Sequence, residues 1–191
     1  TAMTDDGARI ILLDDGHQNP NVHEDLSLVV IDAAQPFGNG HVFPKGPLRE
    51  PVQRGLSRAD AEVLMGEGPV PALVQNCGKP ILRARLAATS PLAPGGWVAF
   101  AGIGRPERFF DALRALPDVR ISEAVPFGDH HAYTAGDLTY LKDLARTHRS
   151  RLITTEKDYV RLPADIRANV QAHVVKAVFD EPEHRDALLA P

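Results

Sequence analysis

The sequence is poor in cysteine and in long apolar runs, and each absence excludes a class of protein. The single cysteine, Cys77, cannot form an internal disulfide and cannot build a zinc site by itself. No apolar run approaches the ~20 residues that a membrane-spanning helix needs, and no signal-peptide pattern opens the chain. The sequence therefore predicts a soluble protein of the cytoplasm.

An excess of basic charge is missing as well. The formal net charge is -4 at pH 7, which argues against a general nucleic-acid-binding protein. Hydrophobic residues make up 43% of the chain and charged residues 24%, a balance that is typical of globular proteins and not of disordered ones. With 191 residues, the chain is long enough to bury a core as one ordinary domain or as two small lobes.

The sequence alternates short apolar runs with segments whose apolar residues recur at helical spacing. The predicted strands include residues 10–13, 26–33, 97–101, 119–125, 151–155 and 172–179. This order predicts an α/β fold with a mostly parallel sheet flanked by helices. A turn rich in proline and glycine at 90–96 divides the chain into a first part, residues 1–92, and a second, small α/β lobe, residues 93–191.

Two carboxylates, Asp14 and Asp15, follow the first apolar run. Ligands bind at the carboxyl edge of open parallel sheets, and a carboxylate there can hold a hydrated Mg2+ ion. Adjacent side chains on a strand point to opposite faces, so the two carboxylates should have different tasks. The string Asp14-Asp15-Gly16 fits an ordinary turn equally well, because Asp caps its own backbone and Gly accepts a positive φ.

Three further polar clusters could carry chemistry. A loop at 36–51 with four prolines and three glycines presents Lys45, Arg49 and Glu50, and the other clusters are Asp129-His130-His131 and residues 154–158. Together they suit metal-assisted phosphoryl transfer better than acyl transfer, because a nucleophile elbow is absent from the sequence. Taken singly, each cluster is also explained as a solvated turn or as first-turn charge on a helix.

These strings, in this order and spacing, resemble the tetraacyldisaccharide 4'-kinases, which phosphorylate the lipid A precursor. The most specific ones are Leu-Asp-Asp-Gly-His-Gln at 13–18 and Pro-Lys-Gly-Pro-Leu-Arg-Glu-Pro at 44–51. The resemblance runs from about residue 10 to residue 162. It implies a P-loop-type kinase that transfers the γ-phosphate of ATP to the 4'-hydroxyl of a tetraacyldisaccharide 1-phosphate, with Mg2+ as cofactor, at the cytoplasmic face of the inner membrane.

The resemblance also implies roles for individual residues. Magnesium would be held by a Walker-B-like pair, Asp14 and Asp15. The implied substrate-binding residues are Gln18, Lys45, Arg49 and Glu50. The implied nucleotide-binding residues are Thr155 and Lys157. Catalysis would fall to His130, which assists or orients a catalytic carboxylate, and to its neighbour Asp129.

The sequence departs from the family in one large feature. It contains no Gly-x-x-x-x-Gly-Lys-[Ser/Thr] motif, since Gly78-Lys79 is followed by Pro80. The chain thus resembles the C-terminal part of the kinase, without the half that brings the P-loop and the membrane-associating helix, and we expect the chain alone not to turn over ATP.

Two alternatives stay open at the level of sequence. The first is a metal-dependent phosphoesterase, with ligands drawn from Asp14, Asp15, Asp129, His130 and His131. The second is a folded module without catalytic activity.

Overall fold

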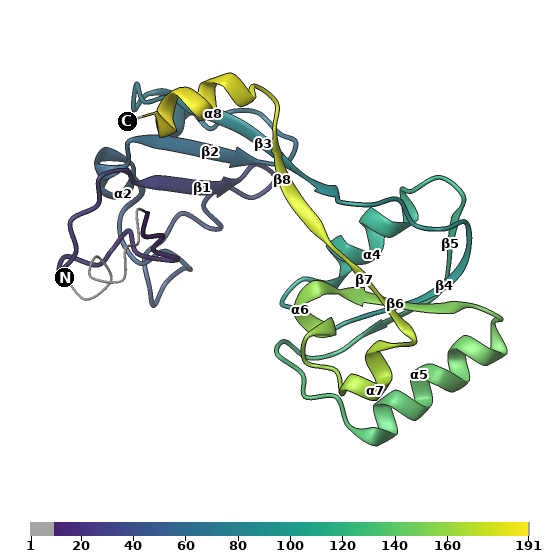
Figure 1. The fold of residues 1–191 in the computed structure, drawn as a ribbon. Coiled ribbons are helices and arrows are strands. Elements are labelled where there is room, and N and C mark those ends of the chain that lie inside the picture. Colours follow the sequence, from purple (N-terminus) through teal and green to yellow (C-terminus); the bar gives the residue numbers. More distant parts are fainter. Residues whose placement is uncertain (1–9, 191) are drawn as a thin grey trace. The chain divides into compact units, whose positions relative to one another are not determined.

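The computed structural model describes residues 10–190 (Figure 1). The chain forms two compact units: unit 1 comprises Thr1–Leu86 and Ala177–Pro191, and unit 2 comprises Ala87–Lys176. This division corrects the expected lobes 1–92 and 93–191 at both ends. Residues 177–191 belong with unit 1 because strand β8 (Val175–Phe179) joins the sheet of that unit.

Unit 1 is built on a four-stranded sheet in the order β1-β2-β3-β8. Its first three strands are parallel: β1 (Leu28–Asp32), β2 (Ala61–Met65) and β3 (Ile81–Ala88). Helices α2 (Val52–Arg58) and α3 (Ala72–Gln75) cover one face, where Leu56 and Val74 pack on Leu64. Helix α8 (Pro182–Leu189) lies on the other face, where Leu188 contacts the cluster of Val63 and Leu82 (Figure 1).

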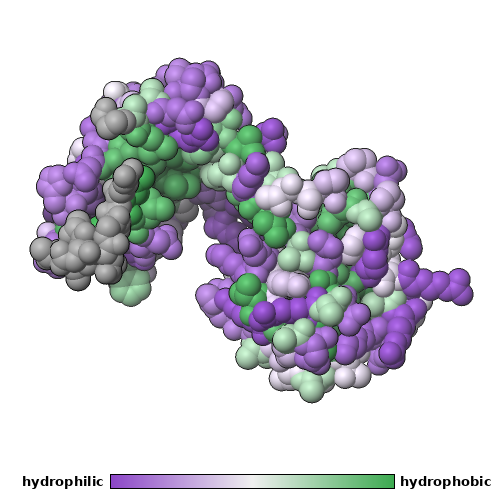
Figure 2. Space-filling view, viewed as in Figure 1, coloured by the Kyte–Doolittle hydropathy of each residue, from purple (hydrophilic) through white to green (hydrophobic). Residues whose placement is uncertain are grey.

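The prediction of a strand at residues 10–13 is wrong. Ile10, Ile11, Leu12 and Leu13 have no regular structure, and they are 80%, 48%, 90% and 47% exposed. A strand needs a neighbour for its N–H and C=O groups, and no strand among residues 10–190 pairs with this segment. Strand β1 stands at the edge of its sheet, with Val30 64% exposed. Residues 10–13 and Val30 therefore expose hydrophobic side chains to solvent. Figure 2 shows hydrophobic surface on unit 1.

Unit 2 contains a fully parallel sheet in the order β5-β4-β6-β7. Its strands are β4 (Gly95–Ala101), β5 (Val119–Pro126), β6 (Arg151–Thr155) and β7 (Val170–His173). Its helices are α4 (Pro106–Arg114), α5 (Ala135–Thr147), α6 (Glu156–Tyr159) and α7 (Ala164–Arg167). The predicted α/β fold with mostly parallel strands is confirmed.

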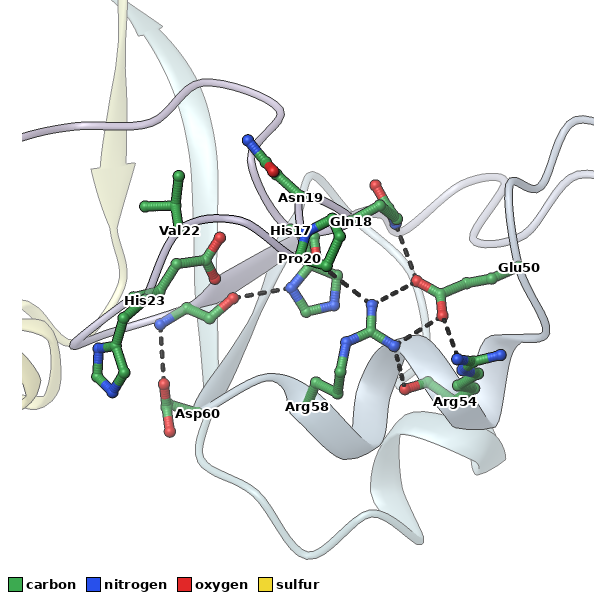
Figure 3. A pocket seen from close by; sticks show the side chains of 12 residues that line it. His17, Gln18, Asn19, Pro20, Val22, His23, Glu50, Arg54, Arg58 and Asp60 are labelled. Atoms are coloured by element: carbon green, nitrogen blue, oxygen red, sulfur yellow. Dashed lines mark hydrogen bonds and ion pairs between the residues drawn. The ribbon is translucent and has the colours of Figure 1, made fainter.

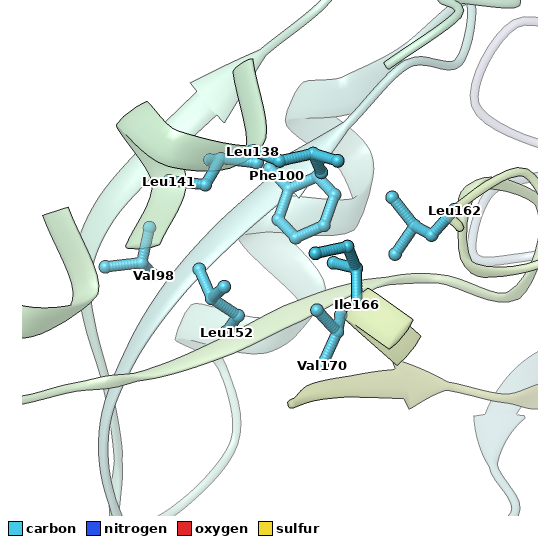
Figure 4. Close-up of a cluster of buried hydrophobic side chains, with 8 residues drawn as sticks. All are labelled: Val98, Phe100, Leu138, Leu141, Leu152, Leu162, Ile166 and Val170. Carbon is cyan, nitrogen blue, oxygen red and sulfur yellow. The ribbon is translucent and has the colours of Figure 1, made fainter. Parts of the chain in front are cut away.

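The two faces of this sheet carry separate cores. Phe100 of β4 packs with Leu138 and Leu141 of α5 and with Ile166 of α7 (Figure 4). On the opposite face, the neighbouring strand residues Ala99 and Ala101 pack with Phe109, Phe110 and Leu113 of α4. The chain therefore leaves β4 toward one face and leaves β6 toward the other. Such a switch point opens a crevice at the carboxyl ends of the two strands, where α/β proteins bind ligands.

The strand expected at 172–179 is divided between two sheets, as β7 and β8. The break falls at Val174, whose carbonyl oxygen accepts hydrogen bonds from the backbone N–H of Thr89 at 2.9 Å and from its hydroxyl at 3.2 Å. The first part of the run, β7, pairs with β6 in unit 2, and the second part, β8, lies beside β3 in the sheet of unit 1.

Candidate active site

The Asp14–Asp15 pair lies in a turn of unit 1. Asp15 adopts a left-handed backbone conformation with φ of 60°, which a short polar side chain tolerates. A Cβ at Gly16 would lie 2.8 Å from Cβ of Leu13, so the turn requires glycine there. Asp14 is exposed and makes no hydrogen bond or ion pair with the described residues. Within residues 10–190, the turn thus presents one carboxylate without a hydrogen bond or ion pair.

Asp15 is held by the proline-rich loop. Arg49 donates two hydrogen bonds to it, from Nη1 to Oδ1 at 2.9 Å and from Nη2 to Oδ2 at 2.7 Å. Both side chains are more than 60% exposed, so the pair adds little stability, but the bidentate geometry fixes both groups. Two residues that the sequence assigned to different tasks, metal binding and substrate binding, are therefore in contact.

Glu50 is bound by several side chains of unit 1. It accepts hydrogen bonds from Arg58 at 2.6 and 2.7 Å and from Gln18 Nε2 at 3.1 Å, and its side chain is 16% exposed. Nε of Arg54 lies 3.9 Å from Oε2 of Glu50, and Figure 3 draws this ion pair. The Arg58 guanidinium, helped by Gln18, lowers the pKa of Glu50 to about 2. Glu50 therefore stays ionised and ties its loop to helix α2.

His17 completes this arrangement, and the sequence did not point to it. Its Nε2 lies 2.9 Å from the carbonyl oxygen of Gly55, which can only accept, so Nε2 carries the proton. Its Nδ1 then accepts from the hydroxyl of Ser27 at 2.8 Å. His17 thus fastens the turn to α2 and to the start of β1.

Two pockets of unit 1 share His17, Gln18 and Glu50. The larger, about 730 Å³, also contains Arg54 and Arg58 (Figure 3). The smaller, about 440 Å³, also contains Asp15 and Arg49. Four residues expected from the sequence, namely Asp15, Gln18, Arg49 and Glu50, therefore line cavities. Asp14 and Lys45 line neither, and the Lys45 side chain makes no hydrogen bond or ion pair with residues 10–190.

We expect unit 1 to lose stability in acid because of Glu50. Its folded-state pKa lies below its ordinary value, so its contribution is present above about pH 4.5 and is lost as the pH falls toward 2. The unfolding temperature of unit 1, followed by NMR, should drop over this range, and Glu50→Gln should flatten the drop. Glu67→Gln, at an exposed position, is the control. An equal pH dependence in wild type and Glu50→Gln would contradict this account.

In unit 2, a fully buried carboxylate, Asp158 of α6, lies where the carboxyl ends of β4 and β6 meet. Its Oδ2 accepts hydrogen bonds from the backbone N–H of Gly102 at 3.0 Å and from the hydroxyl of Thr155 at 2.7 Å. Thr155 also caps helix α6 by accepting from the N–H of Asp158 at 3.1 Å. The Thr155 hydroxyl is thus committed to Asp158, while Lys157 is exposed and makes no hydrogen bond or ion pair within the described chain.

His130 lies at the same edge, after β5. Its N–H donates to the carbonyl oxygen of Gly102 at 3.0 Å, and its φ of 59° is left-handed. Its Nε2 is 3.9 Å from Oδ1 of Asp129, and its Nδ1 is 2.8 Å from Nη2 of Arg161. A left-handed histidine on an exposed loop is a strained feature of the kind found at functional sites. Arg161 is a second residue that the sequence pattern did not single out.

His131 turns away from this group. Its Nε2 is 3.0 Å from Oδ2 of Asp137, and its ring stacks on Phe127 with centroids 4.7 Å apart. His131 and Thr134 lower the pKa of Asp137 to about 2. No cluster of three or more His, Cys, Asp or Glu that could hold a metal occurs in the described range 10–190. The histidines expected for a phosphoesterase metal centre are therefore engaged with Arg161 and Asp137.

The expected site residues fall into two groups, one in each unit. Those of unit 1 are Asp14, Asp15, Gln18, Lys45, Arg49 and Glu50, and those of unit 2 are Asp129, His130, Thr155 and Lys157. No helix among residues 10–190 is both long and apolar enough to cross a membrane.

Comparison with known proteins points to one family. The sequence model of the family described as LpxK, tetraacyldisaccharide-1-P 4'-kinase, matches residues 1–191. The tetraacyldisaccharide 4'-kinase of Hyphomonas neptunium is 60% identical over 190 residues, which cover 100% of this chain and 57% of the relative. That of Maricaulis maris is 50% identical over 194 residues, which cover 96% of this chain and 55% of the relative. The chain therefore spans little more than half the length of these relatives.

A solved structure shares the fold. It is the crystal structure of LpxK from Aquifex aeolicus, described as an "apo" form in complex with ATP. The TM-score is 0.63 at 23% sequence identity, and the match covers 91% of this chain and 54% of the other. At this identity, the likeness establishes the common architecture.

Proposed function

Because the chain belongs to the LpxK family of tetraacyldisaccharide-1-phosphate 4'-kinases, we propose that it is part of an enzyme that transfers the γ-phosphate of ATP to the 4'-hydroxyl of a tetraacyldisaccharide 1-phosphate in lipid A biosynthesis. The observation that carries the proposal is the family match over all 191 residues. The pocket-lining position of Asp15, Gln18, Arg49 and Glu50 supports it.

Asp14 is our candidate ligand for Mg2+. Magnesium keeps several waters and is commonly held by one or two carboxylates together with substrate phosphates, so a cluster of three protein ligands is not required. An exposed, unengaged carboxylate fits this donor set, whereas both oxygens of Asp15 are bound by Arg49. Asp15 would bind the ion only after losing its hydrogen bonds from Arg49. When bound, the ion would neutralise charge on the phosphates.

The remaining residues take supporting roles in this proposal. Arg49, Gln18 and Lys45 would contact the phosphorylated sugar, with Glu50 holding their loop in place. Asp129 and His130 would take part in catalysis, and Lys157 would bind the nucleotide. Thr155 contributes mainly through Asp158, because its hydroxyl is already bonded there.

We further propose that the enzyme works as a peripheral protein at the cytoplasmic face of the inner membrane, where its lipid substrate would lie, and does not bind nucleic acid. The 191 residues alone would not turn over ATP, since they contain no Gly-x-x-x-x-Gly-Lys-[Ser/Thr] loop to hold the β- and γ-phosphates.

The direct test is transfer of label from γ-labelled ATP to tetraacyldisaccharide 1-phosphate. We expect labelled lipid with the full-length gene product and Mg2+, and none with the 191-residue chain alone. Failure of the full-length protein to label the lipid would overturn the proposal. Hydrolysis of a phosphodiester by the 191-residue chain would favour the phosphoesterase reading instead.

A further inference from the structure

We propose that Arg161 is a positioning residue that holds the His130 imidazole in one orientation and one tautomer, with the proton on Nε2. The geometry of this contact stands by itself, and its consequence for catalysis rests on the proposed function. All the residues involved belong to unit 2.

The side chains of Arg161 and His130 are in direct contact. Nη2 of Arg161 lies 2.8 Å from Nδ1 of His130. A guanidinium has only donors and keeps its charge, so Nδ1 must accept this hydrogen bond. An accepting Nδ1 cannot carry a proton, and the proton of the imidazole therefore lies on Nε2. Without Arg161, the His130 side chain, which is 77% exposed, would have little to fix its ring.

Arg161 is itself held by an ion pair with Asp158. Its Nη1 lies 3.5 Å from Oδ1 of the fully buried Asp158, and its side chain is only 30% exposed. Oδ1 makes no hydrogen bond within residues 10–190, and the polar groups that interact with this carboxylate include the Arg161 guanidinium and the Tyr133 hydroxyl, whose pKa is raised by burial and by the Asp158 charge. The other oxygen of Asp158, Oδ2, accepts hydrogen bonds from the N–H of Gly102 and the hydroxyl of Thr155.

The contacts among Gly102, Asp158, Arg161 and His130 close into a ring. Gly102 binds Asp158 through its N–H and accepts the N–H of His130 through its carbonyl oxygen. Asp158 pairs with Arg161, and Arg161 donates to the His130 ring. Gly102 is closely packed, since an added Cβ would lie 3.2 Å from Oδ1 of Asp158 and 3.1 Å from Cβ of His131. Both the backbone and the side chain of His130 are thus held from the end of β4.

The consequence is a defined hydrogen-bonding role for His130. With Nδ1 occupied, the free side of the ring is an Nε2–H group, which lies 3.9 Å from Asp129 Oδ1. That group can donate to a carboxylate or to a phosphoryl oxygen, and it cannot accept a proton in this tautomer. In the proposed kinase, His130 would therefore orient an acceptor and would not act as the general base.

The test is nitrogen-15 NMR of the histidine rings in the 191-residue chain, at a pH where imidazoles are neutral. We expect a protonated Nε2 and an unprotonated, hydrogen-bonded Nδ1 for His130. Arg161→Met should shift the Nδ1 resonance, and Arg161→Lys, which retains a donor, should shift it less. Arg146→Met, at an exposed position of α5, should leave it unchanged.

A proton on Nδ1 in the wild type, or identical His130 resonances in wild type and Arg161→Met, would overturn the proposal. The wild-type tautomer decides the matter even if Arg161→Met does not fold. In the full-length enzyme, Arg161→Met should lower kcat by about tenfold or more with little change in KM, as loss of a residue that orients a ligand does in other sites. The NMR result does not depend on phosphoryl transfer, so failure of the proposed function is distinguishable from failure of this inference.

Discussion

Replacement of Asp14 by alanine in the full-length protein is expected to lower kcat for lipid phosphorylation by about 100- to 10,000-fold. We propose that this carboxylate holds the Mg2+ ion at the ATP phosphates, and metal stabilisation of a phosphoryl-transfer transition state is worth several kcal/mol. Each 1.4 kcal/mol or so of barrier corresponds to tenfold in rate. Because Asp14 is exposed and unengaged within the described chain, the stability of unit 1 should change by less than about 0.5 kcal/mol.

The matched control is Asp25→Ala, which removes a fully exposed carboxylate of the same unit. It should leave both turnover and stability close to wild type. Turnover should be measured at saturating ATP and over a range of Mg2+ concentrations, since a weakened metal site is partly restored by more metal. Wild-type kcat in Asp14→Ala would remove this residue from the metal site.

The sequence predicted unit 2 well because local signals and tertiary packing agree there. Pro106 opens α4, and Thr134 and Asp137 form a capping box at the start of α5. The apolar residues at helical spacing, such as Leu138 and Leu141, are those that face the sheet. Caps and periodicity are read within a dozen residues, so one sequence is enough to find them.

The prediction failed where the outcome depends on a distant partner. Ile10 to Leu13 have the composition of a buried strand, but hydrogen bonding to a neighbouring strand decides whether a strand forms. The run at 172–179 has continuous strand character, but its first residues pair with β6 and its later residues lie beside β3 in the other sheet. A pattern within a segment contains no information about such partners.

The same limit applies to the site. The sequence identified charged residues such as Asp15, Arg49 and Glu50, which the structure brings to pockets of unit 1. It did not identify His17, Arg58 or Arg161, which hold those charges or the His130 ring in place. No sequence motif marks these supporting residues. Their role is to donate a hydrogen bond, and a donor from any part of the chain that lies close enough can do so.

Replacement of Asp158 by alanine is expected to lower the free energy of unfolding of unit 2 by about 3–5 kcal/mol, the range for removal of one partner from a buried ion pair. The variant leaves the N–H of Gly102 and the hydroxyl of Thr155 without their acceptor and the Arg161 charge unpaired. The losses are costly because Asp158 is fully buried, so water does not readily replace it as the partner of these groups. The measurement is urea unfolding followed by fluorescence of Trp97, the single tryptophan of the sequence, which is 3% exposed in β4.

The control is Asp111→Ala in α4, which removes an exposed carboxylate 2.8 Å from Nη1 of Arg114. Exposed pairs of this kind contribute little, so its unfolding free energy should stay within about 0.5–1 kcal/mol of wild type. If Asp158→Ala unfolded at the same urea concentration as this control, the bonds of Asp158 would do no more than offset the cost of burying its charge. The residue would then be retained for the position of Arg161 and His130, and its loss would alter the His130 resonances without altering stability.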